Sequence, residues 1–168
     1  MSVIIEYLQG RGVAFTVLPT PQSETALETA KAHAVPASEL AQTVVVNYRF
    51  GFAMMIMPVE AELNLFLAQA ALDDPDARRA THREVVAHFA GMDATCIPPL
   101  GLYFLAPMWV DPEIAGREQI TFAAGKPSLL IRMRSADLFR DEPYVVTGIS
   151  TSQQTDATVN VPDVADIA

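Results

Sequence analysis

Two β-rich runs that flank a short turn restrict the fold more than any other feature of this chain. The first is QTVVVNYR (42–49), the second is FAMMIMP (52–58), and Phe50-Gly51 is the expected turn. Valine, tyrosine and phenylalanine favour strands, and a connection this short joins only antiparallel strands. The sequence therefore predicts a β-hairpin over 42–58, which excludes an entirely parallel, doubly wound sheet.

Helices and further strands are predicted on both sides of this hairpin. Apolar periodicity and turn residues predict helices over 2–11, 25–34, 60–72, 81–90 and 135–140, and strands over 13–18, 118–124 and 128–134. Two of these helices begin with capping-box spacing, Thr25 with Glu28 and Thr81 with Glu84. Helices that interleave with antiparallel strand pairs predict an α+β domain with a mixed sheet.

The composition indicates a single globular domain. Of the 168 residues, 51% are hydrophobic and 18% charged, enough to bury a core without metal or disulfide staples. The apolar runs fall short of the roughly 20 residues of a membrane span, and the N-terminus lacks the basic start and cleavage site of a signal peptide. Cys96 is the single cysteine, so we expect no internal disulfide and a cytoplasmic protein without membrane contact.

Acidic residues dominate the charge. The formal net charge is −9 and the pI is about 4.6, which is not typical of a nucleic-acid-binding protein. A local basic segment, RRATHREVVAH (78–88), is either a solvated helix start or a basic face. Residues 148–168 are polar, rich in Thr, Ser and Asp, and without periodicity. We therefore expect a domain over 1–147 and a flexible acidic tail over 148–168, the latter a candidate for recruiting a protein partner.

Four prolines interrupt an otherwise apolar segment, CIPPLGLYFLAPMWVDPEI (96–114). Pro98 and Pro99 fix their φ angles and have no amide hydrogen. The amides of Cys96 and Ile97 are then expected to face a ligand, as donors that suit a carbonyl or an oxyanion. The segment is predicted to form a pocket wall, a stiff loop followed by a hairpin. The alternative interpretation is an ordinary connecting loop.

Other residues with chemical potential are sparse. Asp111 precedes a proline, which indicates a turn, although its carboxylate is also a candidate for the pocket. His33, His82 and His88 are scattered without HExxH spacing, and Cys96 has no cysteine partner. We therefore expect no metal. The first predicted strand is not followed by a glycine-rich phosphate loop, so we expect no nucleotide cofactor either.

The order of segments from Val13 to Leu138 resembles the YbaK/EbsC family, the domain also associated with prolyl-tRNA synthetases. The matching segments are RGVAFTVL, ETALETAKAHAVPASELAQTVVV, GFAMMIMP, LNLFLAQAAL, THREVVAHFAG, CIPPLGLYFLAPMWVDPEI and ITFAAGKPSLLIRMRSADL. No single motif is highly specific, and the ordered set carries the identification. The resemblance implies an α+β fold in which helices flank a mixed, largely antiparallel, curved sheet.

Members of this family typically hydrolyse mischarged aminoacyl-tRNAs, especially a small amino acid on tRNA(Pro), by double-sieve editing. The resemblance therefore implies an aminoacyl-tRNA deacylase whose partner is aminoacyl-tRNA, and it places Gln42 and Thr25 as catalytic residues. The substrate-binding residues that it implies are Thr20, Thr43, Thr95, Cys96, Ile97, Pro98, Pro99, Gly101 and Asp111. The candidate tRNA contacts are Arg78, Arg79, Arg83, Arg132 and Arg134.

Three positions depart from the family pattern. Gln42 stands where the family commonly has a lysine, Thr95 where its loop has a glycine, and Thr20 where it has a histidine. Glutamine keeps hydrogen-bonding capacity but lacks the charge that binds a phosphate or stabilises developing charge. Two interpretations stay open: a deacylase, and a catalytically degenerate relative that binds a small ligand or a protein partner in a regulatory role.

Overall fold

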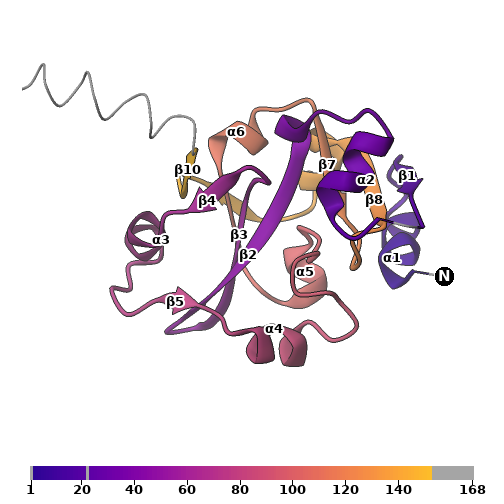
Figure 1. Ribbon diagram of the computed structural model, residues 1–168. Helices are drawn as coiled ribbons and strands as arrows, with labels where there is room; N and C mark the ends of the chain where they lie inside the picture. The colour runs from indigo at the N-terminus through magenta and orange to yellow at the C-terminus, as the bar shows by residue number, and fades with distance from the viewer. Residues whose placement is uncertain (1, 22, 153–168) are drawn as a thin grey trace, which may run out of the picture.

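The computed structural model describes residues 2–21 and 23–152 of the 168-residue chain. Its centre is the predicted hairpin, formed by β2 (Leu40–Tyr48) and β3 (Gly51–Pro58). The turn lies one residue earlier than the predicted Phe50-Gly51, because Tyr48 pairs with Gly51 and the connection is formed by Arg49 and Phe50. Figure 1 shows β2 and β3 as a long twisted pair across the middle of the molecule.

The hairpin belongs to a mixed sheet with the strand order β1-β8-β7-β2-β3-β6-β9, and β5 also pairs with β2. The added strands are β1 (Thr16–Pro19), β5 (Arg78–Arg79), β6 (Met108–Val110), β7 (Gln119–Ala123), β8 (Leu129–Arg134) and β9 (Tyr144–Val146). The pairs β1–β8, β7–β8 and β2–β5 are antiparallel like the hairpin, whereas β2–β7, β3–β6 and β6–β9 are parallel. The prediction of an α+β fold with a mixed, largely antiparallel sheet is confirmed.

Short helices flank the sheet, and the predicted caps form. The helices are α1 (Val3–Arg11), α2 (Ala26–Ala32), α3 (Leu65–Leu72), α4 (His82–His88), α5 (Gly101–Phe104), α6 (Pro112–Ala115) and α7 (Ser135–Phe139), with a 3₁₀ turn, η1, over Ala37–Glu39. Both capping boxes are complete, Thr25 with Glu28 at α2 and Thr81 with Glu84 at α4.

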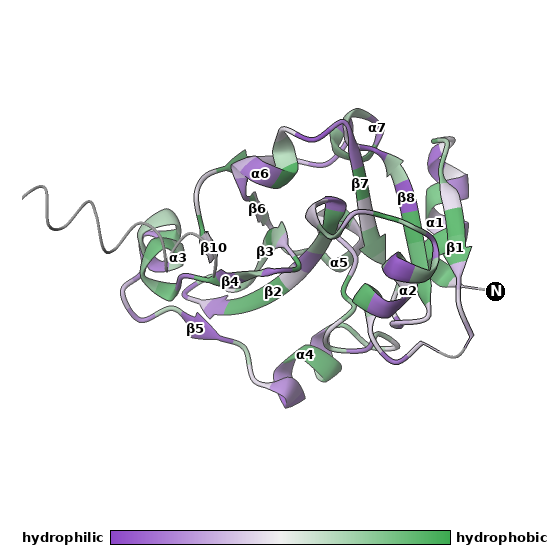
Figure 2. Cartoon of the chain, turned by 45° about the horizontal axis from the view of Figure 1, so that its top comes forward, coloured by the Kyte–Doolittle hydropathy of each residue, from purple (hydrophilic) through white to green (hydrophobic). Residues whose placement is uncertain are grey.

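Both faces of the hairpin are covered, which explains why β3 is apolar without alternation. Met54 and Ile56 point into the main core with side chains of α1, α4, α5, α6 and α7. Met55 and Met57 point to the opposite face, where α3 contributes Ala68 and Leu72. Figure 2 shows hydrophobic stretches in green along the central strands, in contrast to the purple of β5.

Two predicted elements take different forms. The helix predicted over 60–72 begins later, because residues 61–63 form strand β4 (Ala61–Leu63), which pairs with β10 (Ser150–Ser152). The segment 96–114 is not a loop and hairpin. It forms α5, the strand β6 parallel to β3, and α6. The three residues of β6 are too few to signal a strand by alternation, and their neighbour in the sheet is far away in sequence.

The predicted boundary between residues 147 and 148 does not coincide with the end of the folded structure. Ile149 is fully buried, and its carbonyl accepts a hydrogen bond from the Asn64 amide at 2.8 Å. The hydroxyl of Ser150 donates to Asp111 at 2.7 Å. Residues 148–152 thus pack with the domain, and residues 153–168 of the expected tail lie outside the described residues.

Candidate functional site

A cavity of about 250 Å³ opens where α2, β2 and the loop before Pro98 meet. It is lined by Glu24, Thr25, Ala26, Leu27, Ala41, Gln42, Thr43, Val59, Thr95, Cys96, Ile97 and Ala123. Six of the residues predicted from the sequence are among them: Gln42, Thr25, Thr43, Thr95, Cys96 and Ile97. The remainder are mostly small or apolar, so the cavity combines an apolar floor with a few polar groups, as ligand sites commonly do.

The cavity exists because the edge of β2 is covered at both ends and open between them. Strand β7 pairs with β2 at Leu40 and Ala41, and β5 pairs with it at Val46 and Asn47. Within the described residues, no strand pairs with β2 at Thr43 on this edge. The sheet therefore has a gap in which main-chain groups of β2 face the cavity.

The loop on the far side of the cavity is held by its own hydrogen bonds. Asp93 accepts from the Thr95 amide at 2.9 Å and from its hydroxyl at 2.6 Å, and these bonds lower the pKa of Asp93. The Cys96 carbonyl accepts from the Gly125 amide, and the Gly125 carbonyl from the Asp93 amide. These contacts fix the loop against the turn between β7 and β8.

The predicted pair of ligand-facing amides reduces to one. The Cys96 amide donates to the Asp93 carbonyl at 2.9 Å and is not free. The Ile97 amide donates to no acceptor among the described residues, although Ile97 is 3% exposed and lines the cavity. A buried amide without a partner is costly, so the Ile97 amide is available to a ligand. Burial raises the pKa of the Cys96 thiol, which keeps it protonated.

Thr25 lies at the cavity, but its hydroxyl is already engaged. The oxygen accepts from the Glu28 amide at 3.1 Å, and the hydroxyl lies 3.2 Å from the Glu28 carboxylate, to which it donates. The first interaction belongs to the capping box that begins α2, and the second bond of that box runs from the Thr25 amide to the Glu28 carboxylate at 2.9 Å. The direct effect of Thr25 is thus to position the start of α2; its catalytic role stays a prediction.

Gln42 lies at the centre of the site. Its side-chain nitrogen donates to the carbonyl oxygens of Ala61 at 2.8 Å, Pro58 at 3.1 Å and Val59 at 3.3 Å. Besides the cavity, Gln42 lines two adjoining hollows of about 370 and 350 Å³. The three spaces therefore adjoin at this side chain, and together they are called the groove.

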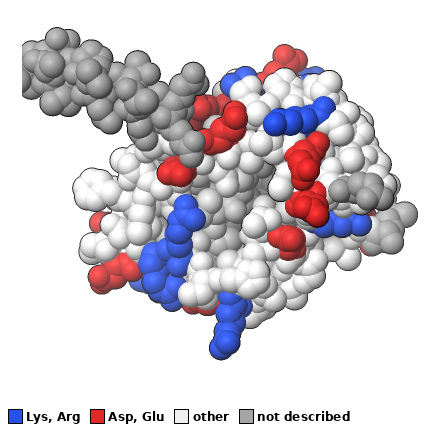
Figure 3. All heavy atoms as spheres, viewed as in Figure 1, with Lys and Arg blue, Asp and Glu red and all other residues white. Residues whose placement is uncertain are grey.

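Basic residues border the groove away from α2. Arg79 lines both adjoining hollows and His82 lines the larger one, while Arg83 is exposed on α4. Figure 3 shows Lys and Arg gathered over β5 and α4 on one side of the hollow, with acidic side chains across from them toward α2. This arrangement favours an elongated ligand with negative charge at the β5 end.

The other arginines predicted to contact tRNA are held by partners or lie elsewhere. Arg78 forms a bidentate pair with Glu84 at 2.9 and 3.1 Å and lowers the pKa of that carboxyl to about 2. Arg132 pairs with Glu39 at 2.7 and 3.0 Å. Arg134 lines a separate hollow beside α7.

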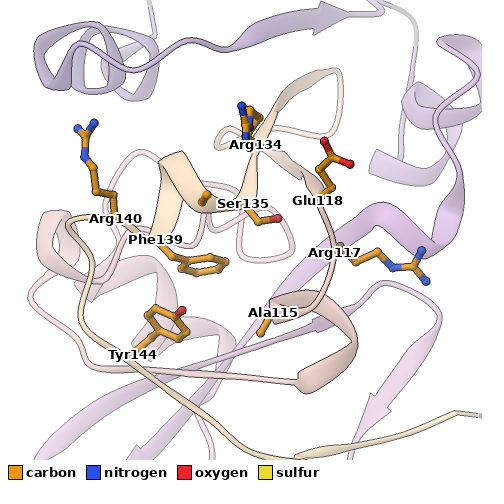
Figure 4. A pocket seen from close by; sticks show the side chains of 9 residues that line it. Ala115, Arg117, Glu118, Arg134, Ser135, Phe139, Arg140 and Tyr144 are labelled. Atoms are coloured by element: carbon orange, nitrogen blue, oxygen red, sulfur yellow. The ribbon is translucent and has the colours of Figure 1, made fainter.

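That separate hollow measures about 410 Å³ and lies between α6 and α7. In Figure 4 the rings of Phe139 and Tyr144 face each other, with centroids 4.6 Å apart, whereas Arg117 and Arg134 extend away from them. Arg140 is paired with Asp141 at 2.9 Å. The polar groups do not converge on one point, so this hollow is a weaker ligand site than the groove around Gln42.

Five predicted substrate-binding residues do not line the cavity. Pro98 and Pro99 are buried, and Gly101 packs against Ala106 and Met108. Asp111 caps α6 by accepting from the Glu113 amide, as its position before a proline indicated, rather than lining the pocket. Thr20 donates its amide to the Ser128 carbonyl, and its hydroxyl oxygen is buried without a partner among the described residues.

Sequence reasoning missed the apolar lining. Ala26 and Leu27 follow directly after Thr25, so the start of the helix was a usable signal. Val59 directly follows β3, and Ala123 is the last residue of β7. Their approach depends on strand pairing over long sequence separations, for which the sequence carries no local signal.

Metal-ligating clusters and membrane-spanning helices are both absent from the described residues. Within residues 2–21 and 23–152, His, Cys, Asp and Glu side chains nowhere gather in threes that could hold a metal ion. The described helices are all too short or too polar to span a membrane.

Residues 20–140 match the sequence profile of the aminoacyl-tRNA editing domain. A proline–tRNA ligase from Thermotoga sp. (strain RQ2) is 31% identical over 88 residues, which are 52% of this chain and 15% of that protein. The chain thus spans a small part of this relative.

Solved structures share the fold. A provisionally assigned trans-editing enzyme for prolyl tRNA synthetase superposes with a TM-score of 0.77 at 23% identity, covering 90% of this chain and 99% of the other. Hypothetical protein APE2540 gives the same TM-score and identity over 88% and 99%. A provisionally assigned signal transduction protein from Marinobacter aquaeolei VT8 gives 0.71 at 18% identity, with 98% of this chain but 34% of that protein covered.

Proposed function

This chain belongs to the aminoacyl-tRNA editing domain family, and we propose that it hydrolyses mischarged aminoacyl-tRNA that carries a small amino acid, with tRNA(Pro) as the tRNA. The observation that carries the proposal is the coincidence of the family match with the cavity. The match includes every residue that lines the cavity, and the cavity is the size of a small ligand. A small cavity admits a small aminoacyl group and excludes a larger one, which is the second sieve of editing.

The polar groups of the cavity suit attack on an ester. Water attacks the carbonyl carbon of the aminoacyl ester, the bond from that carbon to the ribose oxygen breaks, and a proton passes to the ribose oxygen. The Ile97 amide is the donor available for the carbonyl oxygen, on which negative charge develops. The buried, protonated Cys96 is a wall of the cavity rather than a nucleophile.

The groove supplies a path for the tRNA end. Arg79 and His82 line the hollow next to Gln42, and Arg83 lies nearby on α4. Such cations bind phosphates without reading sequence. A nucleotide in the groove would place its aminoacyl ester at the cavity and its phosphate toward β5.

A cavity-filling variant tests this function. Ala26→Phe on α2 places a large ring in the cavity, and it should lower deacylation of Ala-, Ser- and Cys-tRNA(Pro) by tenfold or more. Ala32→Phe, on the same helix but exposed, is the matched control and should retain activity. Absence of deacylation by the folded wild-type protein on all three substrates would contradict the proposal, as would equal activities of the two variants.

The second candidate is a relative that binds a small ligand in a regulatory role without hydrolysing it. It is favoured by Gln42 and Thr95, which replace the lysine and glycine that the resemblance leads one to expect. The signal transduction protein that shares the fold is consistent with such a role. Deacylation by a Gln42→Lys variant, with none by the wild type, would support this candidate over the first.

A further inference from the structure

The orientation of the Gln42 amide decides what this residue presents to a ligand. Its nitrogen lies within 3.3 Å of three main-chain carbonyl oxygens, those of Pro58, Val59 and Ala61. The opposite orientation would place an oxygen against three oxygens, so the nitrogen must face the carbonyls. A primary amide has two hydrogens, and three acceptors use both of them. Gln42 has no hydrogen left to donate to a ligand.

The group that remains is the oxygen Oε1. Among the described residues, no hydrogen bond reaches this atom, and the side chain is only partly buried where the cavity meets the adjoining hollows. Since the three carbonyls fix the amide, Oε1 is a pre-positioned hydrogen-bond acceptor. A lysine ammonium with its three hydrogens would satisfy the same carbonyls but would present positive charge there instead.

The edge of β2 adds main-chain groups next to this oxygen. Odd-numbered residues of β2 direct their main-chain groups away from β3, as the Val45 carbonyl shows by accepting from the Ala80 amide at 2.9 Å. The Leu40 carbonyl, on the even-numbered side, accepts from Val59 instead. Thr43 therefore directs its amide and carbonyl into the gap between β7 and β5.

The charged residues around the cavity also favour a ligand that donates hydrogen bonds. None of the residues that line it is Lys, Arg or His, and its one carboxylate-bearing residue is Glu24. The cavity has an oriented amide oxygen, a carboxylate at its border, and the Thr43 carbonyl, with which no described strand pairs on this edge. These groups favour a cationic donor and disfavour an anion.

We propose that Gln42 determines specificity for a free α-ammonium group, which donates a hydrogen bond to Gln42 Oε1 and is oriented by the edge of β2 at Thr43. The inference rests on the proposed function and deepens it. The site takes an aminoacyl ester whose amino group is unblocked and protonated, and it discriminates against the same acyl group without that amine. The Ile97 amide is then left for the ester carbonyl.

Binding of two non-hydrolysable analogues tests the proposal. In 3′-alanylamino-3′-deoxyadenosine an amide replaces the ester, and 3′-propanoylamino-3′-deoxyadenosine differs from it by the loss of the amino group. Titration calorimetry with the full chain should give a Kd about tenfold to hundredfold lower for the alanyl compound, the range of a hydrogen bond to a charged group. That preference should fall as pH rises through the amino pKa of the ligand, near 8.

Two variants separate recognition from folding. Gln42→Met removes the acceptor and the donors together, whereas Gln42→Lys keeps donors for the three carbonyls and replaces the acceptor by a cation. Both should lose the preference for the alanyl compound and its pH dependence. Gln69→Met is the matched control, because the Gln69 amide binds the Ala77 carbonyl outside the cavity; it should keep both.

Deacylation of Ala-tRNA(Pro), measured in parallel, distinguishes failure of the inference from failure of the function. Equal affinity of the wild type for the two analogues, or binding of neither at millimolar concentration, overturns the inference even if the protein deacylates tRNA. A preference that the Gln42 variants retain overturns it as well. A preference that is present in the wild type and lost in both variants supports the inference, even if no tRNA is hydrolysed.

Discussion

Gly101 provides a test of whether the proline-rich segment packs the core or forms the site. A Cβ added at Gly101 would lie 2.6 Å from the Ala106 carbonyl oxygen and 2.9 Å from Met108 Cγ. Ordinary contacts begin near 3.4 Å, so Gly101→Ala must move α5 from the following backbone by about 0.8 Å, the difference between these distances. The Ala106 amide donates to the Gly101 carbonyl at 3.0 Å, so this movement also strains a hydrogen bond.

The expected cost follows from these contacts. Overpacking of a tight core destabilises a protein by about 1–3 kcal/mol, and strain on the hydrogen bond adds about 1 kcal/mol. Alanine also lowers the conformational entropy of the unfolded chain, which stabilises the folded state by about 0.4–1 kcal/mol. We expect Gly101→Ala to lower the free energy of unfolding by about 1–4 kcal/mol. For a domain of this size, the melting temperature should fall by about 3–10 °C. Because Gly101 lies outside the cavity, the folded variant should bind the alanyl analogue as the wild type does.

Thermal and urea unfolding, followed by circular dichroism, measure this effect. Gly10→Ala is the matched control, since Gly10 lies in α1 with nothing within 4 Å of its added Cβ. It should raise stability by about 0.5–1 kcal/mol through helix propensity. A Gly101→Ala protein as stable as the wild type would refute the packing argument. Unchanged stability with a loss of ligand affinity would return Gly101 to the site.

Two further predictions follow from charged residues. Burial raises the pKa of Glu39, but hydrogen bonds from Arg132 and Thr121 outweigh burial, so the pKa of Glu39 in the folded protein is lowered. The pair of Glu39 with Arg132 should therefore stabilise the fold above the unfolded pKa of Glu39, near 4.5. This stabilisation should be lost as pH falls through the lower pKa of the folded protein. When the free energy of unfolding is measured in urea at pH values from 7 to 3, Arg132→Met should lose less stability than the wild type. Equal losses of stability in the two proteins would contradict the stabilising role of the Glu39–Arg132 pair. For tRNA, Arg79→Ala should weaken binding and make the slope of log K against log salt shallower by about 1, whereas Arg78→Ala, whose guanidinium is paired with Glu84, should change the slope less. Equal salt slopes for the wild type and Arg79→Ala would remove Arg79 from the interface.

Gln42 illustrates how far the sequence reaches into the site. The order of segments placed it in the candidate site, together with Thr43 and the residues from Thr95 to Ile97, and the cavity does bring these residues together. The sequence could not show that three carbonyls hold the Gln42 amide, because Pro58, Val59 and Ala61 approach it through pairing of β2 with β3. The direction of an amide depends on such neighbours.

The proline-rich segment shows the opposite case. Pro98 and Pro99 limited the local backbone, and that limit alone did not reveal which side of the segment faces a ligand. Packing decides it, since the prolines and Gly101 turn into the core while Cys96 and Ile97 remain at the cavity.

Local patterns were sufficient for the hairpin over β2 and β3, for both capping boxes and for the α+β class, because strand propensity, turn length and cap spacing act between residues close in the chain. The cavity was decided by the tertiary structure. It requires β7 and β5 to pair with different ends of β2 and leave Thr43 uncovered, and that gap depends on contacts between residues 40–47, 78–79 and 121–122. No local preference records such contacts, because they become favourable only when the whole sheet has formed.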